Sequence, residues 1–133
     1  MSLTVETPRS ALEVARAADE RAYKESVHHS IPQIASQVLE IVGQRVAAAG
    51  VGLSDARPIR AWAAGGDIRE ENKDRLRLLY RVARGVQLLY DEETARAFLR
   101  SKCPYLGDRS PVDVIALDDE DSVIEALRTF LEN

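Results

Sequence analysis

Apolar residues recur at intervals of three and four along this chain, which is the period of an α-helix. No stretch alternates between apolar and polar residues as a strand does, so the pattern predicts an all-α fold. Helices are expected over residues 10–29, 33–49, 56–64 and 67–90, and three shorter ones after Asp91, Ser110 and Asp118.

Start and stop signals flank these helices. Short polar residues that cap free backbone amides precede four of them. The expected caps are Ser10, Ser30, Ser54 or Asp55, and Asp67. Gly50 and Gly52 are expected to end the helix over 33–49, because glycine adopts the left-handed conformation that follows many helices.

Two helices differ sharply in the width of their apolar faces. Residues 67–90 carry a broad stripe, typical of a helix buried between neighbours, so this helix is expected to be central. Residues 10–29 carry a thin stripe composed mostly of alanine, which indicates a peripheral helix or an arm.

The segment 102–111 interrupts the helical pattern. Pro104 and Pro111 lack a backbone N–H, and Gly107 adopts positive φ without strain. The segment is longer than most connections between helices need. It is either a plain structural corner or a shaped loop with a binding role.

Composition limits the class of protein and the cellular compartment in which it is expected. The 133 residues are 45% hydrophobic and 30% charged, which is enough for one folded unit and no sign of disorder. The single cysteine, Cys103, excludes an internal disulfide and is typical of a reducing compartment. With no secretory signal and no long apolar run, the chain is expected in the cytoplasm and away from membranes.

Charge is unevenly distributed. Residues 57–90 carry eight basic and four acidic side chains, whereas residues 91–133 carry five basic and eleven acidic ones. A basic middle and an acidic end predict two surfaces with two different partners.

Nothing in the sequence indicates catalysis. A phosphate-binding loop, a nucleophile with its base and a zinc-ligand spacing are all missing. His28 and His29 are adjacent on a helix and point in different directions, so a solvated pair is favoured over a metal site. No enzyme activity, cofactor or metal is therefore expected.

The helix over 33–49, the glycine-bounded turn and the helix over 57–64 have the proportions of a helix-turn-helix. In that motif the second helix enters the major groove, and further basic residues hold phosphates. The candidate DNA-binding residues are Arg57, Arg60, Ala61, Ala64, Arg69 and Lys73. The alternative is a solvated basic face without a partner.

Two motifs resemble those of the MbcA/ParS/Xre antitoxin family. Arg57-Pro-Ile-Arg-Ala-Trp-Ala-Ala-Gly-Gly66, followed by Arg-Leu-Arg over 75–77, is similar to the family's Arg-x-x-x-x-Trp-x-x-Gly helix and its continuation. Pro104-Tyr-Leu-Gly-Asp-Arg-Ser-Pro111 resembles the family's Asn-Pro-x-Leu-Gly-Gly-x-x-Pro loop. Cys103 stands where asparagine is usual, and Asp108 where a second glycine is common. The resemblance covers residues 31–133.

The resemblance implies an Xre-like helix-turn-helix bundle over 31–90 and a small helical toxin-binding region over 91–133, preceded by a helical arm over 1–30. It implies an antitoxin of a type II toxin–antitoxin system. Such an antitoxin blocks the active-site entrance of a RES-domain toxin that degrades NAD and, as a homodimer, binds operator DNA to repress its own operon.

Carried over by position, the candidate toxin-binding residues are Tyr105, Leu106, Gly107, Asp108, Arg109, Ser110, Glu132 and Asn133. Two alternatives remain open. One is a stand-alone helix-turn-helix transcriptional regulator, and the other is a helical adaptor whose DNA surface is vestigial.

Overall fold

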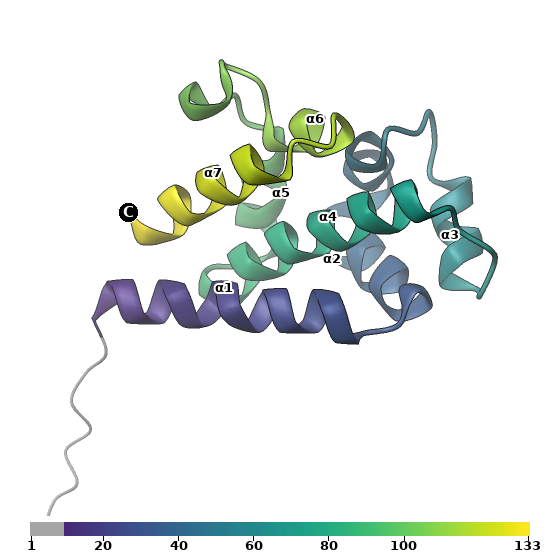
Figure 1. The fold of residues 1–133 in the computed structure, drawn as a ribbon, viewed down its shortest axis with the longest axis horizontal. Helices are drawn as coiled ribbons and strands as arrows, with labels where there is room; N and C mark the ends of the chain where they lie inside the picture. Colours follow the sequence, from purple (N-terminus) through teal and green to yellow (C-terminus); the bar gives the residue numbers. More distant parts are fainter. Residues whose placement is uncertain (1–9) are drawn as a thin grey trace, which may run out of the picture.

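The computed structural model describes residues 10–133, and this part of the chain forms seven α-helices and one short 3-10 helix, with no strand among them (Figure 1). The elements are α1 (Ala11–His28), α2 (Ile31–Val51), α3 (Arg57–Ala63), α4 (Glu70–Leu89), α5 (Glu92–Arg100), η1 (Pro104–Leu106), α6 (Pro111–Ala116) and α7 (Glu120–Glu132). The all-α prediction is confirmed. No helix in the described residues is long and apolar enough to cross a bilayer.

The central helix is α4, as its broad apolar stripe predicts. It contacts α1, α2, α5, α6 and α7, and in Figure 1 it runs through the middle of the molecule. One apolar cluster joins the chain before and after residue 90. Its fully buried members include Val38, Leu79, Ile115 and Leu127. Residues 31–90 and 91–133 therefore share a core.

Two of the four predicted caps are present, whereas the cap expected at Ser54 or Asp55 is wrong, because the N-cap of α3 is Ala56 and makes no side-chain cap. The Ser10 and Ser30 hydroxyls accept hydrogen bonds from the backbone amides three residues on, at 3.2 and 3.3 Å. The cap expected at Asp67 is wrong, because α4 begins three residues later, after Arg69, with no side-chain cap. Residues 66–69 are instead non-helical, and Ile68 packs against the core.

The helix predicted without interruption over 33–49 is broken in its middle. Gly43 has φ 81° and ψ 170°, a conformation outside the helical region, and the chain resumes as a second short helix ending at Val51. A break of this kind leaves carbonyl oxygens at the end of the first half without a partner in the helix. Arg96 of α5 donates a hydrogen bond from Nη1 to the carbonyl oxygen of Ile41, at 3.0 Å.

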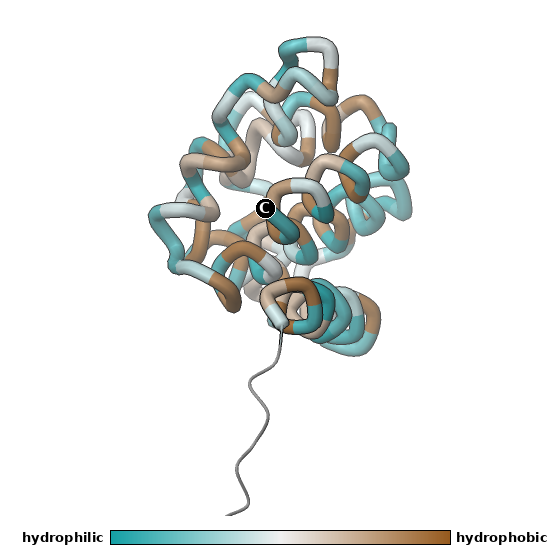
Figure 2. Tube along the Cα trace, turned by 90° about the vertical axis from the view of Figure 1, so that its left-hand side faces the viewer, coloured by the Kyte–Doolittle hydropathy of each residue, from teal (hydrophilic) through white to brown (hydrophobic). Residues whose placement is uncertain are grey.

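The helix α1 lies along one side of the molecule and is seen end-on beneath the other helices in Figure 2. It packs on α4 and α7 through small and polar residues. Those buried in α1 are Ala15, Ala18, Asp19, Ala22 and Ser26. Three arginines of α4 fasten it: Arg81 binds Asp19, Arg84 binds Glu25, and Arg77 donates to backbone carbonyls at the end of α1.

Candidate functional site

The helix α3 presents two different faces. Ile59 and Trp62 are buried in the core, as their spacing predicts. The predicted DNA-binding residues of this helix and its C-cap, which are Arg57, Arg60, Ala61 and Ala64, are all exposed. Ala61 and Ala64 share this exposed face with the two arginines, and their small side chains leave the helix backbone open to close approach.

Arg57 is held by its neighbour Asp55. Its Nε and Nη2 donate to the two carboxylate oxygens at 3.1 and 2.8 Å, and its backbone N–H donates to Oδ1 at 2.8 Å. The side-chain bond and then the backbone bond lower the pKa of Asp55 from 3.8 to about 2. These bonds orient the Arg57 guanidinium, and the lowered pKa keeps Asp55 ionised well into the acidic range.

The break at Gly43 adds residues to this surface that sequence reasoning missed. Gln44 accepts a hydrogen bond at Oε1 from Nη1 of Arg60, at 2.6 Å. Arg45 is exposed and lines a shallow hollow together with Asp55. The available signal was the glycine within a helical pattern, which marks the start of a new short helix before the turn.

The other two predicted DNA contacts lie at the start of α4. Arg69 is the exposed residue before the helix, and Lys73 forms an ion pair with Glu70 at 3.0 Å. The remaining arginines of α4 serve other helices. These are Arg75, Arg77, Arg81 and Arg84. Seven of the eight basic side chains in 57–90 thus bind other groups of the described chain, and the basic excess is not one external surface.

The segment 102–111 is a closed turn. The Cys103 N–H donates to the Arg109 carbonyl at 3.0 Å, and both Gly107 (φ 66°) and Asp108 (φ 61°) adopt the left-handed conformation. Tyr105 is 65% exposed, whereas Leu106 is 2% exposed. Leu106 therefore anchors the turn in the core. Its side chain was predicted to contact a partner, but it is buried in the free protein.

Of the other candidate toxin-binding residues, one is buried and three are exposed. Ser110 is buried and caps α6, accepting from the Asp113 N–H at 3.4 Å. Arg109 is exposed, although its Nε donates to the Leu106 carbonyl at 2.9 Å. Glu132 and Asn133 are exposed at the end of α7, which contacts η1. Figure 1 shows this end of the molecule opposite α3.

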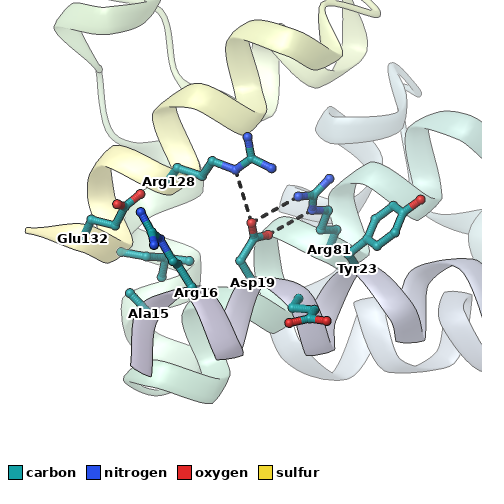
Figure 3. Close-up of a pocket in the computed structure, with 9 residues that line it drawn as sticks. Ala15, Arg16, Asp19, Tyr23, Arg81, Arg128 and Glu132 are labelled. Carbon is teal, nitrogen blue, oxygen red and sulfur yellow. Dashed lines mark hydrogen bonds and ion pairs between the residues drawn. The ribbon is translucent and has the colours of Figure 1, made fainter. Parts of the chain in front are cut away.

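A third feature is a polar hollow of about 430 Å³ between α1 and α7, which sequence reasoning missed (Figure 3). At its base the Asp19 carboxylate accepts from Arg81 at 3.0 and 3.1 Å and from Arg128 at 3.4 Å. The Arg81 guanidinium lies 4.9 Å from the centre of the Tyr23 ring. Because these partners are distant in sequence, no local pattern relates them.

Within residues 10–133, no three His, Cys, Asp or Glu side chains are grouped so that they could hold a metal ion. Comparison of the chain with protein-family models, curated proteins and solved structures finds no match in any of the three.

Proposed function

We propose that the chain is an antitoxin of a type II toxin–antitoxin system. It neutralises a RES-domain, NAD-degrading toxin by blocking the entrance to the toxin's active site, and it represses its own operon as a DNA-binding homodimer in the cytoplasm. The protein works by binding and not by catalysis.

The conformation of residue 108 carries this proposal. Asp108 stands where the similar antitoxin loop commonly has a second glycine, and its φ of 61° lies in the region that glycine favours. Aspartate is among the few other residues that tolerate this conformation. The chain thus keeps the backbone shape that the family's glycine suits. The turn also displays Tyr105 while Leu106 holds it in the core.

The positions of the two candidate surfaces support two binding roles in one chain. The exposed face of α3 and the turn over 103–109 lie at opposite ends of the molecule (Figure 1). A toxin at one end therefore leaves the other end accessible to DNA.

Co-expression with a RES-domain toxin tests the antitoxin function. Cells should resume growth, and the two proteins should purify as a stable complex. Tyr105→Glu should abolish both effects without changing the unfolding temperature, because the side chain is mostly solvated in the free protein. Leu12→Glu, a change at an exposed apolar position of α1, is the matched control and should rescue fully. Growth arrest despite abundant wild-type antitoxin would contradict the proposal.

A transcriptional regulator without a toxin is the second candidate function, favoured by the two exposed arginines of α3. Binding to its own upstream DNA should weaken steeply as salt concentration rises. Arg60→Glu should abolish that binding, whereas Arg100→Glu, the same charge reversal on an exposed residue of α5, should reduce it only slightly. If Arg60→Glu binds as well as wild type, α3 is not the recognition helix. The adaptor alternative predicts no specific DNA binding by any variant.

A further inference from the structure

The hollow in Figure 3 is one part of a longer groove. Three hollows, of about 430, 400 and 580 Å³, share Arg81 as a lining residue. The first lies between the middle of α1 and the end of α7, the second reaches the junction of α6 and α7, and the third follows α7 itself. We call their union the α1–α7 groove. Its walls are α1 and α7, and α4 contributes its floor.

Most arginines that line the groove already bind other groups of the chain. Arg81 and Arg128 both bind Asp19, and Arg75 binds Asp118 at 2.8 and 2.9 Å. Arg77 donates to the carbonyls that end α1. Of the five arginines that line the groove, only Arg16 makes no ion pair or hydrogen bond through its side chain within residues 10–133.

The negative charge is in excess. Nine acidic side chains line the groove, and six of them form no ion pair with the described part of the chain. These six are Glu71, Asp74, Glu120, Asp121, Glu125 and Glu132. Four of the six lie on α7, so the α7 wall is strongly acidic, and it repels nucleic acid.

The opposite wall offers apolar surface. Tyr23 and Val27 of α1 are 49% and 48% exposed, and both line the groove. The α1 wall therefore combines these two exposed apolar side chains with polar and charged ones, and the α7 wall is predominantly acidic. An occupant that matches both carries apolar side chains on one face and lysine or arginine on the other.

We propose that the α1–α7 groove binds a basic amphipathic helix of a partner protein. The acidic wall, α7, has 13 residues, which corresponds to about 20 Å of helix, so it matches about four turns of a bound helix. This surface is separate from the exposed face of α3 and from the turn over 103–109, and of the candidate toxin-binding residues only Glu132 lines it. The proposal does not depend on the antitoxin function.

A designed peptide of about 14 residues, with leucine along one face and lysine along the other, is the probe. Fluorescence anisotropy of the labelled peptide with the full chain should show saturable binding that weakens with salt. The double variant Asp121→Lys with Glu125→Lys should weaken the affinity at least about tenfold, because each change reverses a wall charge. The double variant Glu92→Lys with Glu93→Lys makes the same charge change on α5 and should bind like wild type.

Apolar recognition is tested separately. Val27→Asp should weaken peptide binding, and backbone amide shifts on adding the peptide should concentrate in α1 and α7. All variants are first checked for wild-type helical content and unfolding temperature.

Three results would overturn the proposal. One is equal loss of binding in the two double variants, which indicates unspecific attraction. Another is undiminished binding of a peptide whose leucines are replaced by serine. The last is a wild-type dimer in sedimentation that the groove variants dissociate, because the occupant is then a second copy of the chain. Rescue from a toxin enters none of these readouts, so the two proposals fail separately.

Discussion

At the scale of single residues, Gly43 sets the shape of α2. With φ 81° and ψ 170° it occupies a region that is essentially restricted to glycine. A Cβ added there would meet no heavy atom within 4 Å. The requirement for glycine thus comes from the backbone itself and not from crowding. The break it allows turns Gln44 toward Arg60.

Replacing Gly43 by alanine should lower the free energy of unfolding by about 1–3 kcal/mol, the cost of a strained backbone. Urea unfolding followed by Trp62 fluorescence measures this. Gly85→Ala is the matched control. A Cβ at Gly85 would lie 3.8 Å from the Cβ of Ala22 and 3.8 Å from the Cδ1 of Leu131, which are ordinary contacts. The free energy of unfolding should therefore rise by up to about 1 kcal/mol, because alanine favours the helix more than glycine does. Equal stabilities of the two variants would contradict the argument.

Glu25 makes stability depend on pH. Burial alone raises its pKa, but hydrogen bonds from Arg84, Tyr80 and Arg21 outweigh that effect and lower the pKa from 4.5 to about 2. A lowered folded-state pKa means that the stabilisation is complete above pH 4.5 and is lost as the pH falls toward 2.

Acid unfolding should therefore show a loss on the order of 1–2 kcal/mol in this pH range that Glu25→Gln lacks, allowing for solvent screening of the bonds. Denaturant unfolding at a series of pH values measures the difference. Parallel pH profiles of variant and wild type would show that Glu25 does not titrate as described.

At the scale of elements, α1 stands apart from the other long helices. It buries alanines, an aspartate and a serine, and only Ala15 of α1 belongs to the main apolar cluster. Its attachment depends on arginines of α4 and α7. A helix held chiefly by polar contacts can open without unfolding the rest of the molecule.

Asp19→Asn should weaken this attachment by about 2–4 kcal/mol, because it leaves the buried Arg81 without a counter-charge. Hydrogen exchange should then accelerate in α1 while the amides of α2 and α4 stay protected. Glu20→Gln alters an exposed ion pair with Lys24 on the same helix and should have almost no effect. Equal acceleration in α1 and α4 would show that α1 does not open alone.

At the scale of the whole molecule, the helices before and after residue 90 form one body. Arg75 of α4 joins them, since it binds both Asp118 and the carbonyl oxygen of Val51. The shared core adds many apolar contacts across the same boundary. A unit of this size with one core is expected to unfold in a single step.

Unfolding curves from Trp62 fluorescence and from far-ultraviolet circular dichroism should therefore coincide. Trp62 is the only tryptophan and lies in α3, whereas dichroism reports all helices. Separate midpoints would show that the chain does not unfold as one unit.

The sequence by itself determined the features that depend on near neighbours in the chain. Helical periodicity located the helices, and the hydroxyls of Ser10 and Ser30 marked two of their starts. The spacing of Ile59 and Trp62 determined which face of α3 is buried. Each of these depends on residues within one or two helical turns, and their geometry follows directly from the sequence.

Only the tertiary structure decided which charges face outward. Asp19 and Arg81 are separated by 62 residues and meet because α1 packs on α4. The burial of Leu106 likewise follows from the packing of its turn on α7. A count of charges along the chain does not distinguish an arginine that binds another helix from one that is free to bind a partner, because that depends on how distant segments pack. The acidic groove beside α1 therefore emerged only from the fold.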